Sequence, residues 1–439
     1  MHVRNILILV ILFIANYCVL LYNHIIIIKE KSFLKEFLMK SIKKLANKSI
    51  FKRIDWVLIG LLTTLCVISV IIINSAMSGG QYSSDFGVRQ ILYYILGGLI
   101  AYAIMMVSPK RLKGMTYILY GILMILLLGL LILPSTPLTP TINGAKSWYK
   151  LGPISVQPSE FMKIVLILAL AKVVSQHNKF TFNRSLETDV KLILKILAVA
   201  VPPMLFILLQ NDLGTTLVIC AILAGIFIVS GISWKILGPI FITAIVIGAS
   251  LILSIIFKPS LLENISGIKT YQLGRINSWL DPYTFSSGDG YHLTESLKAI
   301  GSGQLVGKGI NSGEVYIPEN HTDFIFSVIG EELGFIGSVL ILLVFLGLLL
   351  HLVRLALKNN SAFNKTFIIG YTALLLFHIL QNVGMTIQLL PITGIPLPFV
   401  SYGGSALWSL MTGIGVILSI YYHESKPYEP NKAFSRLKK

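Results

Sequence analysis

The chain of 439 residues is much more apolar and less charged than a soluble protein. Hydrophobic residues make up 55% of the chain and charged residues 13%, and the mean hydropathy is +0.79, whereas soluble domains have about 25% charged residues. This composition excludes a disordered chain, a cytosolic enzyme and a small disulfide-rich protein. The three cysteines, Cys18, Cys66 and Cys220, are too few and too dispersed for a disulfide framework or a metal cluster. The sequence therefore predicts an integral membrane protein.

Eleven apolar runs follow one another along the chain, each near the ~20 residues that cross a bilayer core. The first run, residues 6–28, is too long for a signal peptide and lacks a small-residue cleavage site, so we expect a signal anchor or an extra membrane helix. The runs do not alternate as β-barrel strands do. The other ten are residues 56–76, 91–107, 115–134, 160–175, 191–209, 214–232, 236–257, 325–352, 366–388 and 400–421.

Basic residues are concentrated in alternate connections between these runs. Residues 29–53 alone hold nine lysines and arginines, and connections rich in these residues face the cytoplasm. The net charge of +17 therefore reflects membrane topology and attraction to anionic lipid head groups, not nucleic-acid binding.

The connections predicted on the outer side include two long ones, residues 135–159 and 258–324. Long connections are more often functional than idle. Because the sequence shows neither a fixed-period repeat nor interrupted helices in matching halves, one compact membrane domain is expected. We predict an all-α polytopic domain at residues 54–422, preceded by a hydrophobic segment and basic linker at residues 1–53 and followed by a basic tail at residues 423–439.

Two charged residues at the start of run 160–175 stand out, because charge at membrane depth is costly. Pro158 suits the first turn of a helix, and Glu160 and Lys163 are three residues apart, which places them on one helical face. Two interpretations remain open for this pair. It lines an outward cavity that holds an anionic head group, or it is a structural ion pair that locks the helix.

Acids also precede or begin other apolar runs. Asp212 can cap the helix that follows it, line a cavity, or do both. Asp323 lies where the second long connection enters the membrane, and loss of hydration there raises the pKa of a carboxyl and makes it a better proton acceptor near neutral pH. A cation such as Lys163 would oppose that shift, and a simple helix cap is the alternative role for Asp323. Of Glu331 and Glu332, one is expected to face inward, and a structural role is open for both.

Four further residues are candidates for binding in the outer connections. His321 is interpreted as a hydrogen-bonding group, because no second His or Cys lies at metal-ligand spacing. Lys146 and Trp148 belong either to an interfacial belt or to a platform on which a sugar or lipid stacks. Arg89 lies on the outer side, against the usual charge bias, so we expect it to meet an anion.

Six motifs occur in order over about residues 54–422, and together they resemble the SEDS proteins, the group that contains RodA, FtsW and SpoVE. The resemblance is greatest to the elongation branch, RodA. The motifs are Asn143–Trp148, Gln157–Glu160, Asp212–Thr215, Gly290–His292, His321–Phe324 followed by Glu331–Gly334, and Pro396–Ser405.

The resemblance implies a ten-helix peptidoglycan glycosyltransferase, with residues 6–28 as one extra helix. Such an enzyme polymerises lipid II into β-linked glycan on the outer face of the bacterial cytoplasmic membrane, together with a class B penicillin-binding protein that cross-links the strands. Asp323 matches the essential aspartate of the family, and it is also the residue that could hold a divalent cation, Mg or Mn. The residues expected to bind substrate are Trp148, Lys146, Glu160, Lys163, Arg89, Asp212, Gln272, Arg275, His321 and Ser401.

One departure from the family pattern and two alternative functions bear on the catalytic role of this chain. The connection after Asp281 and Pro282 lacks a second acid that is common in relatives, which weakens a catalytic role for an acid there. A flippase for lipid-linked precursors also suits many spans and a charged cavity, but it should have polar residues along the whole path, whereas these candidates lie at outer helix ends. A scaffold that only binds a partner would not need Glu160 and Lys163.

Overall fold

The computed structural model describes residues 53–78, 86–141, 144–152, 154–180, 185–257, 270–285 and 289–424. The predicted helix at residues 6–28, the basic linker up to residue 52 and the tail after residue 424 lie outside the described residues. The chain divides into two compact units, residues 61–420 and residues 1–60 together with 421–439. Of the second unit, the structure describes the start of one helix and the end of another.

All ten apolar runs after the first fall on helices, as predicted. These helices are α4 (Trp56–Ser78), α5 (Phe86–Met105), α6 (Pro109–Ile132), α7 (Pro158–Phe180), α8 (Leu186–Leu209), α9 (Leu213–Ser230), α10 (Trp234–Phe257), α14 (Ile325–Lys358), α15 (Ala362–Thr386) and α16 (Gly404–Glu424). Eight of them, all except α7 and α10, are long and apolar enough to cross a membrane. The described chain is thus a mostly helical, multi-pass membrane protein, close to the predicted all-α class.

The two long connections contain short regular elements that the apolar pattern did not reveal. Strands β1 (Tyr149–Leu151) and β2 (Ile154–Val156) form an antiparallel hairpin in the first, with Tyr149 opposite Val156. In the second, α12 (Thr270–Leu280) and α13 (Asp289–Ser302) are helical. Both helices are amphipathic and only weakly apolar overall, so they resemble surface helices and not membrane spans. The Gly290–His292 motif lies in α13.

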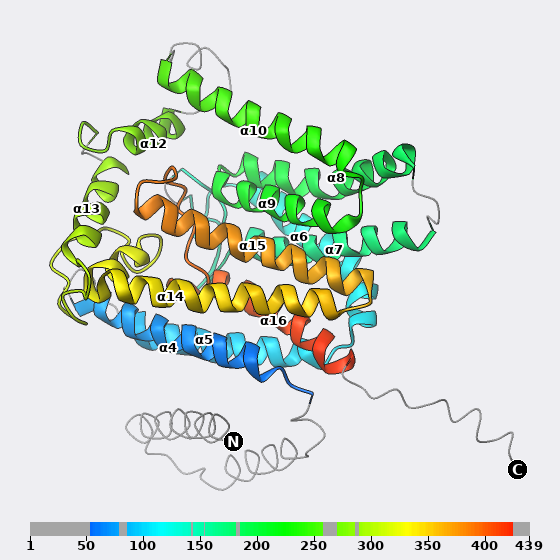
Figure 1. The fold of residues 1–439 in the computed structure, drawn as a ribbon, viewed down its shortest axis with the longest axis horizontal. Helices are drawn as coiled ribbons and strands as arrows, with labels where there is room; N and C mark the ends of the chain where they lie inside the picture. Colours follow the sequence, from blue (N-terminus) through cyan, green and yellow to red (C-terminus); the bar gives the residue numbers. More distant parts are fainter. Residues whose placement is uncertain are drawn as a thin grey trace, which may run out of the picture. The chain divides into compact units, whose positions relative to one another are not determined.

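Helix α15 packs against α9, α7 and α14, and Figure 1 shows it between α9 and α14. Glycines permit this close packing, as small residues commonly do between membrane helices. A side chain at Gly370 would approach Ile167 of α7 to 2.9 Å, and one at Gly225 would approach Ala373 to 2.5 Å. Since α15 is enclosed in this way, most of its polar side chains are buried inside the protein.

Helix α14 is interrupted near its start by Gly334, whose φ of 66° and ψ of −164° are not helical. The chain between α13 and α14 supplies the hydrogen bonds that the interruption removes. The amide of Phe335 donates to Gln304 O at 2.9 Å, and the amide of Lys308 donates to Glu331 O at 3.0 Å. A side chain at Gly334 would come within 2.3 Å of the Gly307 nitrogen, so glycine is required at this contact.

Both Glu331 and Glu332 are buried, where one was expected to face inward. Glu331 Oε1 accepts hydrogen bonds from Lys308 Nζ at 2.7 Å and from the amide of Glu314 at 2.9 Å. Glu332 Oε1 accepts from the Ser75 hydroxyl. The Glu331 bonds attach the connection before α14 to the first turns of that helix, and the Glu332 bond attaches those turns to α4. Both acids therefore have the structural role that the sequence left open.

Candidate active site

A buried ion pair lies in the first turns of α7, which begins at Pro158 as predicted. Lys163 Nζ lies 2.8 Å from Glu160 Oε1, and Lys163 is 1% exposed. The Ser409 hydroxyl of α16 donates to Glu160 Oε2 at 3.2 Å. A buried charge is tolerated only when it is paired and hydrogen-bonded, and both conditions are met here.

His378 of α15 is the second partner of the Lys163 ammonium, at 3.3 Å from His378 Nε2. The other ring nitrogen, Nδ1, lies 3.2 Å from the carbonyl oxygen of Pro396. A carbonyl only accepts hydrogen bonds, so Nδ1 carries the proton and Nε2 accepts from Lys163. The ring therefore joins the ion pair of α7 to the chain that follows α15.

Asp212 is the N-cap of α9. Helix capping was one of the two roles predicted for it. Its carboxylate accepts hydrogen bonds from the Thr215 amide at 2.9 Å and from Gln157 Nε2 at 3.0 Å. Burial raises the pKa of Asp212, and the bonds from Thr215 oppose that shift. Because Gln157 directly precedes α7, Asp212 ties the beginnings of α7 and α9 together.

Asp323 lies in the turn just before α14, which we call the Asp323 turn (residues 319–324). The alternative role of helix cap is wrong, because Phe324 occupies the N-cap position. The Asp323 side chain is half-buried, and no side chain in the described residues donates a hydrogen bond to its carboxylate. The pKa of Asp323 is raised to about 6, chiefly by burial and also by the charge of Glu319, while Arg275 of α12 opposes the shift. The cation that opposes the rise in this pKa is thus Arg275 and not Lys163, which was the expected one.

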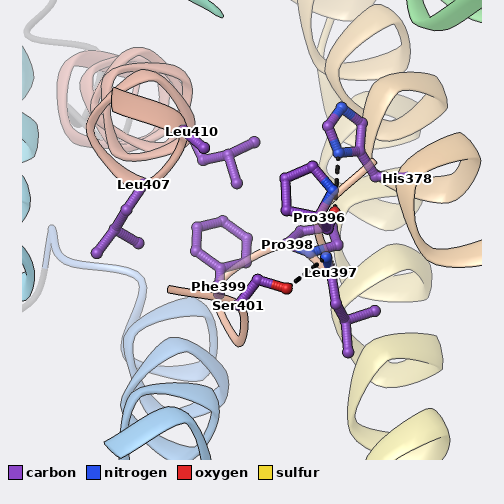
Figure 2. Close-up of a pocket in the computed structure, with 9 residues that line it drawn as sticks. His378, Pro396, Leu397, Pro398, Phe399, Ser401, Leu407 and Leu410 are labelled. Atoms are coloured by element: carbon purple, nitrogen blue, oxygen red, sulfur yellow. Dashed lines mark hydrogen bonds between the residues drawn. The ribbon is translucent and has the colours of Figure 1, made fainter. Parts of the chain in front are cut away.

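The Asp323 turn is held by α15 and by the chain between α15 and α16. The Asn382 side chain of α15 donates to Asp323 O at 2.7 Å, and the Ser401 hydroxyl donates to Thr322 O at 2.6 Å. A small pocket with room for about one water molecule lies behind this chain. Figure 2 shows His378, Pro396 and Ser401 on one side of it, facing Leu407 and Leu410 of α16.

Aromatic rings and Arg89 lie beside the Asp323 turn. The ring of His321 stacks on Phe86, with centroids 4.7 Å apart, and Tyr402 contacts both rings. Burial lowers the pKa of His321, whereas Glu319 raises it. Burial raises the pKa of Tyr402, and Arg89 lies close enough to oppose that rise. Predicted residues Arg89, His321 and Ser401 are therefore gathered around the turn that carries Asp323.

The other predicted residues are less closely associated with this turn. Lys146 donates to the Leu133 carbonyl, so its ammonium is directed at the backbone, and Trp148 is half-buried just before β1. Gln272 lies on α12, and its side chain is outside the described residues. Asp281 is an exposed turn residue that accepts hydrogen bonds from the amide and hydroxyl of Thr284, and these bonds lower its pKa.

Two buried polar residues of α15, His378 and Asn382, were missed by the sequence analysis. They lie four residues apart in run 366–388, so they share one helical face. Polar side chains at membrane depth are themselves a signal of function, and that signal was available. The described residues contain no group of three or more His, Cys, Asp or Glu side chains that could hold a metal ion.

Comparison with known proteins gives matches over most of the chain. The model of the cell cycle protein family FtsW, RodA and SpoVE matches residues 50–426. The peptidoglycan glycosyltransferase MrdB of Escherichia coli (strain K12) is 34% identical over 379 residues, which cover 84% of this chain and 94% of MrdB. Stage V sporulation protein E of Bacillus subtilis (strain 168) is 32% identical over 376 residues, 83% of this chain and 96% of that protein.

Solved structures agree with these matches. A chain from a study of structural coordination of polymerization and crosslinking by a peptidoglycan synthase complex has a TM-score of 0.67 and 29% identity, and the match covers 85% of this chain and 99% of that one. The crystal structure of the rod shape determining protein RodA of Thermus thermophilus has a TM-score of 0.59 and 27% identity, over 85% of this chain and 98% of that one.

Proposed function

Because the chain belongs to the family of cell cycle proteins that contains FtsW, RodA and SpoVE, we propose that it is a peptidoglycan glycosyltransferase, the activity in the name of its relative MrdB. Its substrate is lipid II, which it polymerises into β-1,4 glycan strands for cell elongation and shape. One observation in the site carries this proposal. Asp323, at the start of α14, keeps a half-buried carboxylate with a pKa raised to about 6, which suits a proton acceptor near neutral pH.

The reaction needs a base and a means of stabilising the leaving group. A sugar hydroxyl of one chain attacks the anomeric carbon of the other, the bond from that carbon to pyrophosphate breaks, and the hydroxyl proton passes to Asp323. Single displacement inverts the anomeric centre, so an α-linked donor gives a β-linked glycan. Pyrophosphate gains negative charge as it leaves, and cations stabilise that charge.

Arg275 and Arg89 are the cations that we assign to the pyrophosphate. Arg275 is close enough to Asp323 to oppose the rise in its pKa, and Arg89 is an exposed side chain beside Tyr402. Lys163 is fully engaged with Glu160 and His378 inside the protein. It therefore supports the site from behind instead of meeting the lipid pyrophosphate directly.

A divalent cation, Mg or Mn, is a proposed cofactor of the same site. Magnesium is typically held by one or two carboxylates together with substrate phosphates. The Asp323 and Glu319 carboxylates belong to one turn, and the charge of Glu319 raises the pKa of Asp323. They therefore fit that donor set. A bound cation would neutralise charge on the pyrophosphate.

The proposed working context is the cytoplasmic membrane, with the site on its extracytoplasmic face and a class B penicillin-binding protein as transpeptidase partner. Two observations support this context. Basic residues are concentrated in the connection before α4, and such a concentration is typical of the cytoplasmic side. A structural relative was studied as a peptidoglycan synthase complex that coordinates polymerization and crosslinking.

The test is synthesis of glycan by the purified full-length chain from lipid-linked disaccharide, with and without a cognate transpeptidase. Polymer on a gel is the expected result, and Asp323→Asn should lower the rate by at least ~10²-fold, the lower end of what a positioned base contributes. The matched control is Asp281→Ala, which removes an exposed acid of the same connection and should keep most activity. Wild-type protein that moves the lipid across vesicles without making polymer would be a flippase, and the proposal would be wrong.

A further inference from the structure

Three buried polar side chains on α15, His378, Gln381 and Asn382, hold the chain segment that follows this helix. Each contacts one backbone carbonyl of residues 391–401, which we call the return segment. The carbonyls belong to Pro396, Pro391 and Ile395, at 3.2, 2.8 and 2.8 Å respectively. Since a buried carbonyl without a hydrogen bond is costly, these contacts determine where the return segment lies.

The return segment in turn contacts the Asp323 turn directly. The backbone of Gly394 is so close to Asp323 that a side chain there would come within 3.1 Å of Oδ2. The Ser401 hydroxyl accepts from the Leu397 amide at 2.8 Å and donates to Thr322 O at 2.6 Å. A shift of the return segment would therefore move the carboxylate that accepts the proton in the proposed reaction.

Of these three side chains, His378 is the one that also bonds to Lys163 in the described residues. One ring nitrogen donates to Pro396 O, and the other accepts from the Lys163 ammonium at 3.3 Å. The two bonds lie on opposite sides of one rigid ring that is 2% exposed. The ring thus connects the Glu160–Lys163 pair to the return segment without a flexible step between them.

We propose that His378 is a positioning residue of the glycosyltransferase: its bond to Pro396 fixes the return segment, and the segment fixes Asp323 for proton transfer. This inference rests on the proposed function and adds a residue to it. The bond to Lys163 stabilises the buried ion pair and holds the ring in place. The two bonds of His378 thus have separable consequences, one for turnover and one for stability.

Two substitutions separate these consequences, because each amide side chain reproduces one ring nitrogen. In His378→Asn the amide nitrogen lies near the place of Nδ1 and can still donate to Pro396 O, but the acceptor for Lys163 is lost. In His378→Gln the amide oxygen reaches the place of Nε2 and can accept from Lys163, but the donor to Pro396 is lost. Thr372→Val is the control, since within the described residues the Thr372 hydroxyl donates to Ile368 O of its own helix, at 2.7 Å.

The expected result is opposite behaviour of the two variants. His378→Gln should unfold close to the wild-type temperature but lose about tenfold or more in kcat with little change in KM, since small misplacements of a reacting group are costly. His378→Asn should unfold at a lower temperature and keep a higher kcat than His378→Gln. Equal kcat for His378→Gln and Thr372→Val would overturn the proposal, as would a kcat that follows the loss of stability in both variants.

Hydrogen exchange supplies a readout that does not depend on activity. In His378→Gln the amides of residues 391–401 should exchange faster than in the wild type, whereas in Thr372→Val they should not. Unchanged exchange there in a folded His378→Gln overturns the inference even if His378→Asn does not fold. Absence of glycan synthesis by the wild-type protein would instead reject the proposed function. The exchange measurement would still test whether His378 fixes the return segment.

Discussion

Asp323 and Asp281 belong to the same connection before α14, yet their surroundings move their pKa values in opposite directions. Asp281 is exposed and accepts two hydrogen bonds from Thr284, which lower its pKa. Asp323 is half-buried, and burial raises its pKa to about 6. Exposure and hydrogen bonding therefore distinguish the proton acceptor from the turn residue, although both are aspartates.

The raised pKa of Asp323 predicts the pH dependence of the rate. A base must be ionised to accept a proton, so glycan synthesis should rise with pH, with a midpoint near pH 6. The measurement is kcat/KM from about pH 4.5 to about pH 8, a range that extends on both sides of the midpoint. Asp281→Ala should show the same midpoint, and a flat profile across this range would contradict the assignment of Asp323 as the base.

The same shift has a consequence for stability. The unfolded Asp323 carboxyl ionises near its usual value of about 3.9, so between about pH 4 and pH 6 the folded state binds more protons than the unfolded state and stability falls as pH rises. Asp323→Asn removes this effect. The unfolding temperature of the variant relative to the wild type should therefore be higher at pH 8 than at pH 4.

The Glu160–Lys163 pair is predicted to behave as one unit. Truncating either partner leaves the other charge buried without compensation, which costs about 3–5 kcal/mol. Glu160→Gln and Lys163→Met should each lower the unfolding temperature as well as the rate. The double variant should recover much of the stability but not the turnover, because the charged pair that supports the site from behind is then absent. Single variants that are stable and active would show that the pair has neither role.

At the scale of the element, local signals in the sequence predicted helix positions and several helix beginnings. Apolar runs gave the ten helices, Pro158 marked the start of α7, and Asp212 marked the cap of α9. These helix signals depend on residues that are only a few positions apart in the sequence. The bond between Lys163 and His378 joins positions 215 residues apart, and a single sequence gives no record of such pairs. The helices α12 and α13 were missed because their apolar pattern is weak.

The interruption of α14 leads to a prediction for Gly334. Its backbone conformation is open essentially to glycine alone, and another residue there costs about 1–3 kcal/mol in strain. The added methyl group would also meet the Gly307 nitrogen, so Gly334→Ala should separate the connection from α14 and lower both the unfolding temperature and the rate. The control is Gly121→Ala in α6, where a methyl group meets nothing within 4 Å. Equal unfolding temperatures for the two variants would show that the contact is not required.

At the scale of the whole molecule, the candidate site residues lie at matching ends of alternate membrane helices. Arg89 is near the start of α5, Glu160 near the start of α7 and Asp212 at the start of α9, while Asp323 precedes α14. His378 lies in the last third of α15, which runs back toward the return segment. A polymerase that works at one membrane surface needs its polar groups at one end, whereas a flippase needs them along the path.

The last prediction concerns residues 1–38, which lie outside the described residues and before the start of the family match at residue 50. The match to MrdB covers 94% of that protein, so the polymerase relatives correspond to the rest of this chain. Deletion of residues 1–38 removes the first apolar run but leaves six basic residues, Lys40, Lys43, Lys44, Lys48, Lys52 and Arg53. Because basic residues next to the first span fix its orientation, the remaining helices should insert in the same direction.

The truncated chain should therefore fold and synthesise glycan at the wild-type rate, measured in the same lipid-linked disaccharide assay. The matched control keeps the truncation and replaces those six basic residues with glutamine, which should disturb insertion because the orientation signal is then lost. Orientation is measured by protease access to a tag placed before residue 39. A truncated chain that is correctly inserted but inactive or unstable would show that the first apolar run is a working part of the enzyme.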